Sequence, residues 1–340
     1  MTTALKVANL TKELGNRLVL DNITFEVEKG EIFGIIGMSG SGKTTLLSHL
    51  IGFLEPDEGE IQYHSDRILA KSKTPGELRQ LKKSMQTVKS IFGFAPQTAS
   101  FYPRLTVEEN LIHFGSLHKV PMKQLLENMK KLLEMTKLDQ HRKKLAEHLS
   151  GGMQRRLSIM CGMIHSPEIL ILDEPTADLD PVLREDMWKL IREINDMGTT
   201  IIVASHFLHE MEAMCQRIAL LSNGKLLKYG EVEEVKDAFT NNSAVEIKVE
   251  STPEYIKALY SNIGKIYADK VHKEAERITV YTKRPKDTLL DMVNILKTKK
   301  IPVNTLEVHR PTLREVFERV ARSEMGQKKG ELDDFRTDHS

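Results

Sequence analysis

The residues with the clearest chemical meaning form a glycine-rich loop near the amino terminus. They match the phosphate-binding pattern G-x-x-x-x-G-K-[ST] and run Gly37, Met38, Ser39, Gly40, Ser41, Gly42, Lys43, Thr44 and Thr45. Glycines let the backbone turn successive N–H groups toward phosphate oxygens. A lysine at the end of such a loop can reach the β- and γ-phosphates, and a threonine hydroxyl can hold Mg²⁺ beside them. The loop therefore predicts that the chain binds a nucleoside triphosphate, with Lys43 and Thr44 in these roles.

Two acidic residues follow an apolar segment much further along the chain. Asp173 and Glu174 come directly after residues 169–172, and Pro175 then ends the strand that this segment predicts. Ligands bind at the carboxyl ends of strands in open α/β sheets, so these carboxylates are expected at such an edge. Asp173 could hold Mg²⁺ through a water, and Glu174 could polarise an attacking water. The alternative is that both acids cap the helix that follows.

The segments around these residues predict how they are positioned. Residues 31–36 form an apolar run that is typical of a buried strand, and residues 46–51 begin a helical pattern after the loop. A helix that starts there directs the positive end of its dipole at the phosphates. The alternative is a glycine-rich turn that matches the phosphate-binding pattern by chance, and such a turn would require neither the strand before it nor the helix after it. Residues 199–204 predict a further buried strand, and Thr106 with Glu109 forms a capping box that predicts a helix start.

The pattern along the whole chain predicts an α/β domain, a second small domain and a tail. Apolar runs alternate with helical patterns over residues 1–238, which favours a largely parallel sheet. Over residues 243–322 the order becomes β-α-β-β-α-β, the ferredoxin-like α+β order. Residues 323–340 are polar and are predicted to be disordered. The expected strands of the small domain are 244–250, 265–271, 277–282 and 303–308, and the expected helices are 253–263, 287–297 and 312–321.

The composition and charge of the chain limit the cellular compartment and the kinds of partner that are expected for it. The 340 residues carry a formal net charge of +1, so no overall field attracts nucleic acid, and no nucleic-acid partner is expected. Cys161 and Cys215 lack metal-ligand spacing and indicate buried thiols in a reducing compartment. The chain shows neither a secretory segment nor a run of about 18 uncharged apolar residues, so we expect that any membrane path belongs to a separate partner.

A further motif resembles a known family. Residues 149–155 read Leu-Ser-Gly-Gly-Met-Gln-Arg, and the serine and glycine amides at a helix start would form another anion site. The segment resembles the signature of ATP-binding cassette (ABC) ATPases, in which each chain closes on the γ-phosphate held by its partner. The resemblance therefore implies a head-to-tail dimer, as a homodimer or as a heterodimer with a second ABC ATPase. It also implies that four residues of this segment bind ATP in trans, that is, the ATP held by the partner chain: Ser150, Gly151, Gly152 and Gln154.

Other motifs of the family occur in the expected order between residue 5 and about residue 235. Gln97 resembles the Q-loop glutamine, Asp178 and Asp180 lie in a D-loop-like segment, and His206 resembles the switch histidine. The resemblance implies a P-loop NTPase cassette with a helical subdomain and Glu174 and His206 as catalytic residues. It also implies that Mg²⁺ is held by Thr44, Gln97 and Asp173. The chain departs from the family at Leu14, where an aromatic residue usually stacks on adenine; leucine offers a weaker contact.

The carboxyl-terminal part narrows the resemblance. Residues 311–317 are similar to the P-[ST]-L-x-x-V-F segment that closes the appended domain in ATPase subunits of ABC-2-type exporters. This resemblance implies a cytoplasmic motor subunit, peripheral on the inner face of the cell membrane through an integral-membrane permease. An importer ATPase subunit, a soluble ABC ATPase of an assembly machine and a non-hydrolysing nucleotide-binding regulator remain alternatives. The presence of Glu174 and His206 argues against the last.

Overall fold

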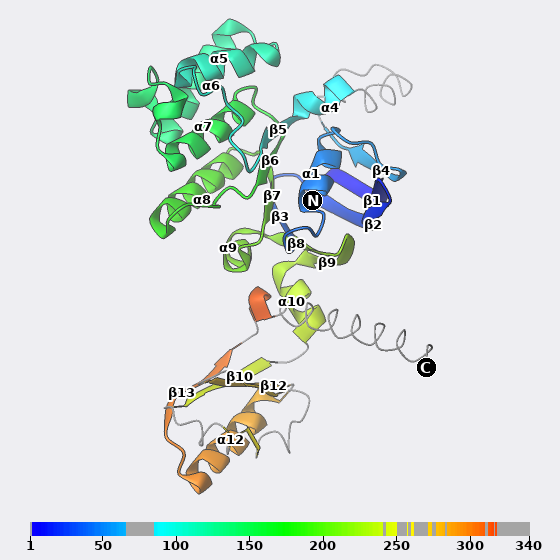
Figure 1. The fold of residues 1–340 in the computed structure, drawn as a ribbon, viewed down its shortest axis with the longest axis vertical. Coiled ribbons are helices and arrows are strands. Elements are labelled where there is room, and N and C mark those ends of the chain that lie inside the picture. The colour runs from blue at the N-terminus through cyan, green and yellow to red at the C-terminus, as the bar shows by residue number, and fades with distance from the viewer. Residues whose placement is uncertain are drawn as a thin grey trace, which may run out of the picture. The chain divides into compact units, whose positions relative to one another are not determined.

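The chain divides into two compact units, Met1–Val232 and Glu233–Ser340, which are described separately (Figure 1). The computed structural model describes residues 2–65, 85–240, 243–249, 257, 260–261, 271–273, 277–282, 284–309, 312–315 and 317. The tail predicted over residues 323–340 lies outside these ranges. Within the described ranges, no helix combines the length and the apolar character that crossing a membrane requires.

The first unit is built on one mixed sheet in the order β4-β1-β2-β9-β8-β3-β7-β6-β5. Its strands are β1 (Thr3–Leu14), β2 (Arg17–Glu28), β3 (Ile32–Ile36), β4 (Glu58–Tyr63), β5 (Phe92–Ala95), β6 (Ile169–Asp173), β7 (Thr200–Ser205), β8 (Arg217–Ser222) and β9 (Lys225–Glu231). Strands β5, β6, β7, β3 and β8 pair in parallel, whereas β1 pairs antiparallel with β2 and β4. The carboxyl ends of β3, β6 and β7 therefore meet at one edge.

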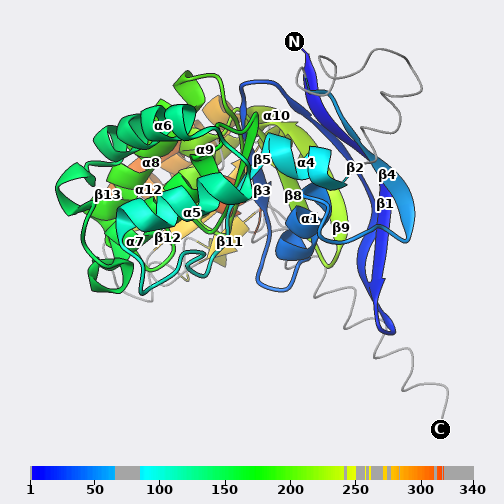
Figure 2. The ribbon, with the colours of Figure 1, turned by 90° about the horizontal axis from the view of Figure 1, so that it is seen from above.

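Helices of the first unit cover the sheet and form a separate cluster beside it. They are α1 (Lys43–Leu50), α4 (Met85–Ile91), α5 (Val107–Leu117), α6 (Met122–Thr136), α7 (Gly151–Met163), α8 (Pro181–Asp196) and α9 (Leu208–Met214), with 3₁₀ turns η1 (Asp139–His141) and η2 (Ala146–His148). Both ribbon views place α5, α6 and α7 together on the side of the parallel strands opposite β1, β2 and β4 (Figures 1 and 2). The predicted capping box at the start of α5 is confirmed, because Thr106 and Glu109 exchange side-chain to backbone hydrogen bonds.

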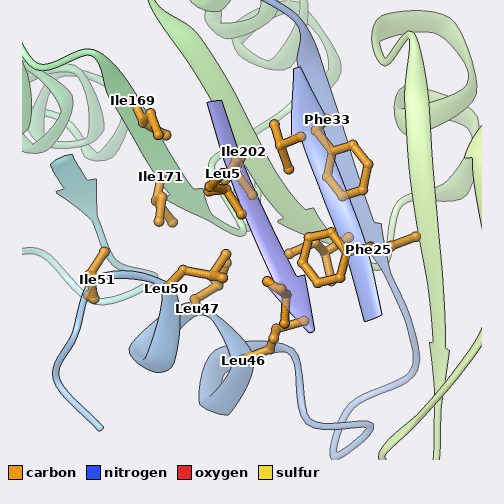
Figure 3. Packing of buried hydrophobic residues seen from close by; sticks show 14 of the residues in the cluster. Leu5, Phe25, Phe33, Leu46, Leu47, Leu50, Ile51, Ile169, Ile171 and Ile202 are labelled. Atoms are coloured by element: carbon orange, nitrogen blue, oxygen red, sulfur yellow. The ribbon is translucent and has the colours of Figure 1, made fainter. Parts of the chain in front are cut away.

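The core of the first unit holds the helix after the glycine-rich loop against the sheet. Leu46, Leu47 and Leu50 of α1 are fully buried, and they face apolar side chains of the parallel strands, including Ile171 and Ile202 (Figure 3). Full burial of such a side chain stabilises the fold by about 1.5–3 kcal/mol. This packing fixes the first turn of α1, and with it the end of the loop, against the carboxyl edge of the sheet.

The predicted strands and helix around the loop are observed with small differences in their limits. The apolar segments at 169–172 and 199–204 are β6 and β7, each with its last residue one position later than predicted. The helix that was expected from residue 46 begins at Lys43 instead. Gly42 precedes it with φ +104°, a conformation that favours glycine, so the chain turns into the helix at once.

The second unit contains the four-stranded antiparallel sheet β11-β12-β10-β13, the strand order of a ferredoxin-like fold. Its elements are α10 (Val232–Thr240, whose first residue belongs to the first unit), β10 (Ser243–Val249), β11 (Val271–Lys273), β12 (Arg277–Thr282), α12 (Pro285–Lys299) and β13 (Val303–His309). The strand predicted at 265–271 is observed at its last position and continues to Lys273, where pairing with Ile278 of β12 extends it. Residues 262–270 lie outside the described part. In the two other predicted helices, the described positions 257, 260–261, 313–315 and 317 are helical, whereas Thr312, the first residue of the helix predicted at 312–321, is not.

Candidate functional site

The glycine-rich loop joins β3 to α1 in a shape that only glycine tolerates at several points. Gly40 and Gly42 have φ values of +81° and +104°. A Cβ atom at Gly37 would lie 2.3 Å from the Ser41 hydroxyl oxygen and 2.5 Å from the Leu221 carbonyl oxygen. The Ser41 hydroxyl is buried and has no hydrogen-bond partner among the described residues. Because buried polar groups are almost always paired, this hydroxyl is suited to a polar ligand held by the loop.

Lys43 lies beneath the loop with its amine surrounded by oxygen atoms. Its Nζ donates to the carbonyl oxygens of Gly37 at 2.8 Å and Met38 at 3.3 Å, and lies 3.8 Å from Glu174 Oε1. Burial lowers the pKa of Lys43, while the nearby carboxylates of Glu174 and Asp173 raise it. The amine is thus a cation that little water reaches, in a position where it can meet an anion bound by the loop.

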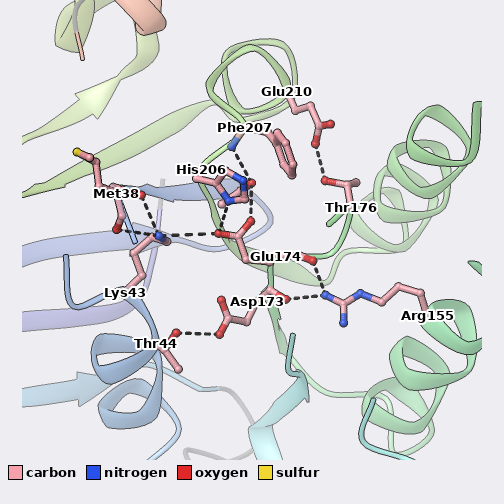
Figure 4. Close-up of polar contacts among 12 residues, drawn as sticks. Met38, Lys43, Thr44, Arg155, Asp173, Glu174, Thr176, His206, Phe207 and Glu210 are labelled. Carbon is pink, nitrogen blue, oxygen red and sulfur yellow. Dashed lines mark hydrogen bonds and ion pairs between the residues drawn. The ribbon is translucent and has the colours of Figure 1, made fainter. Parts of the chain in front are cut away.

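Asp173 and Thr44 bring two oxygen ligands together at the end of β6. The Thr44 hydroxyl donates to Asp173 Oδ2 at 3.1 Å (Figure 4). Burial raises the pKa of Asp173, and the hydrogen bond from Thr44 opposes that shift. A hydroxyl and a carboxylate that meet beside a phosphate loop are ligands that Mg²⁺ accepts together with phosphate oxygens. These two residues therefore fit the ion that was inferred from the sequence.

Gln97 is the third predicted ligand of that ion. It follows β5, and its side chain is exposed. Its main-chain carbonyl accepts a hydrogen bond from Arg155 at 2.9 Å, whereas its magnesium-binding role remains a prediction.

The side chains of Glu174 and His206 contact each other directly, although they follow different strands, β6 and β7. The ring nitrogen Nδ1 of His206 lies 2.9 Å from Glu174 Oε1, and it must carry the proton because a carboxylate only accepts. Ser205 donates to the other carboxylate oxygen at 3.2 Å. Glu174 is buried, whereas the His206 side chain is 52% exposed. The pair thus joins a buried carboxylate to an imidazole that solvent or a second chain can reach.

The signature-like residues lie at the start of α7, and they contact residues of α7 itself and of the neighbouring η2 and α8. Ser150 is the N-cap of α7 and accepts from the Met153 amide at 3.4 Å. Gly151 is exposed with open space where a Cβ would lie, while Gly152 packs against Leu183. Gln154 donates to the Ala146 carbonyl oxygen at 3.2 Å. The helix therefore presents an open amino terminus at Ser150 and Gly151.

The D-loop-like residues and Leu14 are exposed. Asp178 has φ +61° in the turn after β6, and Asp180 caps α8 by accepting from the Leu183 amide at 3.0 Å. Leu14 ends β1 opposite Arg17 and is 46% exposed, so its side chain is free to contact a flat ligand. The structure thus gives Asp180 a clear local function as a helix cap, and the contact of Leu14 with adenine stays a prediction.

Several residues around the site were not singled out from the sequence. Arg155 lies inside the signature-like segment, and its guanidinium reaches the main chain on both sides of Glu174. Glu210 is buried on α9 and accepts from Thr176 at 2.6 Å and from Trp188 at 2.9 Å (Figure 4 shows the first of these bonds). Arg155 could have been singled out from the sequence because it lies within the signature-like segment. No sequence pattern marked Glu210, which lies in a short helix.

Comparisons with known proteins give consistent matches. A family model described as "ABC transporter" matches residues 20–177. The chain is 31% identical over 325 residues to the Nod factor export ATP-binding protein I of Ralstonia nicotianae, with 95% of each protein covered. It is 27% identical over 313 residues to the linearmycin resistance ATP-binding protein LnrL of Bacillus subtilis, with 92% of this chain and 96% of that protein covered. The similarity to these two relatives therefore extends well beyond the segment matched by the family model.

Solved structures match as well. A structure of the ATP-binding subunit of an ABC transporter matches with a TM-score of 0.60 and 27% identity, covering 70% of this chain and 93% of the other. A nucleotide-free ATP-binding cassette from an ABC transporter matches with a TM-score of 0.57 and 27% identity, covering 69% of this chain and 94% of the other.

Proposed function

The chain belongs to the ABC transporter family of ATP-binding proteins, and we propose that it is the ATP-hydrolysing motor subunit of an ABC-2-type exporter. It contains the P-loop NTPase cassette fold of the matched structures, and ATP hydrolysis coupled to transport is the general activity of its family. Similarity over nearly the whole chain to proteins named for Nod factor export and linearmycin resistance supports the exporter assignment. The domain limits 1–238 and 243–322 form part of this proposal.

The observation that carries the hydrolytic role is the convergence of Lys43, Asp173, Glu174 and His206 at one edge of the sheet (Figure 4). We infer that Lys43 binds the β- and γ-phosphates, in place of its present carbonyl acceptors. Glu174 accepts a proton from the attacking water as it approaches the γ-phosphate. With both ring nitrogens protonated, His206 keeps its bond to Glu174 through Nδ1 and donates from Nε2 to a γ-phosphate oxygen.

Magnesium belongs to this proposal as the ion that accompanies ATP. Thr44, Asp173 and Gln97 would hold it, the first two of which already meet at 3.1 Å. When bound, the ion would supply positive charge that offsets the negative charge of the triphosphate. Gln97 differs from Thr44 and Asp173 because it lies on the connection between β5 and α5, which we call the Gln97 segment. This segment connects the site to the helices beside the sheet.

A membrane partner is proposed at the pocket beside the Gln97 segment. The pocket encloses about 410 Å³ and is lined mainly by apolar and aromatic side chains, among them Phe53, Phe92, Phe94 and Phe114. Phe53 is 57% exposed, and Tyr102 on the same connection as Gln97 is 50% exposed. Exposed aromatic groups around a pocket favour a protein partner. A permease docked there would hold the chain at the inner face of the membrane.

Production of the chain together with a polytopic membrane protein encoded beside its gene tests the exporter role. We expect the two proteins to copurify and the ATPase rate to rise in the complex. Phe53→Asp should weaken copurification, whereas Met197→Asp, a similar change at an exposed apolar residue of the first unit, should not. A chain that purifies alone, with an unchanged ATPase rate, would favour the ATPase of an assembly machine instead.

The proposed head-to-tail dimer, in which the signature of each chain contacts the ATP held by its partner, predicts the behaviour of Ser150→Arg. The variant should bind ATP like the wild-type chain but hydrolyse it at less than about a tenth of the wild-type rate, because the arginine fills the position that receives the partner's γ-phosphate. Loss of a helix cap alone costs about 1 kcal/mol, so Thr106→Ala, which removes the cap of α5, is the control for stability. Phosphate release and ATP titration measure the two effects, and full activity of Ser150→Arg would show that the signature is not used in trans.

A further inference from the structure

Arg155 makes an unusual set of contacts, although no role in binding ATP or Mg²⁺ is assigned to it. Its guanidinium donates to the main-chain carbonyl oxygens of two separate segments. The distances are 3.1 Å from Nε to Pro175, 2.6 and 2.9 Å from Nη1 to Pro96 and Gln97, and 2.6 Å from Nη2 to Asp173, and Nη2 also donates to Glu174. A planar guanidinium can hold several acceptors in one fixed geometry, which a lysine amine cannot.

These contacts join three parts of the site that are distant in the sequence. Arg155 belongs to α7 and is the last of the signature-like residues, and its acceptors lie just after β5 and at or just after the end of β6. The segment after β5 carries Gln97, and the segment after β6 carries Glu174. One partly buried side chain therefore holds the main chain of both segments at once (Figure 4 shows its contacts with Asp173 and Glu174).

The backbone of Glu174 needs such support. Its φ is +49°, a left-handed conformation that costs a residue with a side chain about 1–2 kcal/mol. The Glu174 amide donates to the Ala204 carbonyl oxygen of β7 at 2.8 Å, and the Glu174 carbonyl accepts from Arg155. The residue is thus held from both sides, with its carboxylate directed to His206 and Lys43. Loss of the arginine contact would let this peptide relax and move the carboxylate.

We propose that Arg155 is a positioning residue for hydrolysis, which holds the Glu174 carboxylate in place and links it mechanically to the Gln97 segment. The inference rests on the proposed role of Glu174 in polarising water. Through the shared guanidinium, a displacement of the Gln97 segment changes the position of Glu174. Arg155 itself contacts neither the loop lysine nor the imidazole within the described contacts, so it acts through the main chain of Glu174.

Steady-state ATPase measurements on the full chain with Arg155→Gln test this inference. We expect kcat to fall at least about tenfold, while the dissociation constant for ATP stays within about twofold of wild type. Arg156→Gln is the matched control: Arg156 is the next residue of α7 and donates to the Thr136 carbonyl oxygen, away from the site. It should leave both constants unchanged. Thermal unfolding without nucleotide then shows whether the two variants are equally folded.

A double variant shows whether Arg155 acts through Glu174. In a chain that already carries Glu174→Gln, Arg155→Gln should cause little further loss of the residual rate, because the carboxylate it positions is gone. If the two losses multiply, Arg155 acts elsewhere and the inference is wrong. Equal kcat values for Arg155→Gln and Arg156→Gln would also overturn it. Should Arg155→Gln fail to fold, Arg155→Lys keeps the charge but not the fork, and a wild-type kcat in that variant overturns the inference.

The two proposals fail in different ways. A Glu174→Gln chain with wild-type activity would overturn the proposed hydrolytic site itself. An inactive Glu174→Gln chain together with a fully active Arg155→Gln chain would leave that site in place and overturn only the positioning role.

Discussion

We expect a chain carrying Glu174→Gln to bind ATP with nearly wild-type affinity but to hydrolyse it at least about 10²-fold more slowly. The amide keeps the shape of the side chain. Its oxygen can still accept from His206, and its NH2 group can donate to the Ser205 hydroxyl, but the amide cannot take up a proton from water. Phosphate release gives the rate, and calorimetric titration gives the affinity. Glu193→Gln makes the same change of charge at an exposed position of α8 and should have no effect.

The same variant should accumulate as an ATP-bound dimer. Because ATP that is not hydrolysed keeps bridging the loop of one chain and the signature of the other, gel filtration with Mg²⁺ and ATP should show a species of twice the mass. Wild-type protein should show it less, since hydrolysis removes the bridging phosphate. A variant that remains a monomer at micromolar concentration, although it binds ATP, would contradict the head-to-tail sandwich.

Lys43→Ala should lose most of its ATP affinity. Hydrogen bonds to charged groups contribute about 1.5–3 kcal/mol, so the dissociation constant should rise roughly ten- to a hundredfold. The loss is expected to be large because Lys43 is a buried cation aimed at the loop, with the carboxylates of Glu174 and Asp173 on its other side. Lys189→Ala, which removes an exposed cation from α8, is the control. Equal affinities of Lys43→Ala and wild type for ATP would show that the loop does not bind triphosphate as proposed.

The sequence was most informative where local pattern and chemistry coincide. The apolar runs before the loop and before Asp173 predict strands because fully buried parallel strands have no polar face, and β3 and β6 are buried along their whole length. The capping box at Thr106 could be predicted because its contacts lie within four residues. The segments that carry Lys43, Asp173, Glu174 and His206 could therefore be predicted from the sequence alone.

Contacts between distant residues could not be derived in this way. The hydrogen bond between Glu174 and His206 depends on the order of β6 and β7 in the sheet, which local patterns do not specify. The Arg155 contacts depend on where α7 packs beside the ends of β5 and β6. In the second unit, β11 continues past its predicted end at residue 271 to Lys273, which pairs with Ile278 of β12, and hairpin register is a property of the pair rather than of either segment.

Mixing two inactive variants tests the central claim most directly, namely that two copies of this chain form a composite site from the loop of one and the signature of the other. In a heterodimer of Lys43→Ala and Ser150→Arg, one site combines an intact Lys43 with an intact Ser150, and the other site carries both changes. We expect each variant alone to be nearly inactive and an equal mixture to recover up to about a quarter of the wild-type rate, because half of randomly formed dimers hold one intact site of two. A mixture as inactive as its components, although both variants are folded, would contradict the composite site.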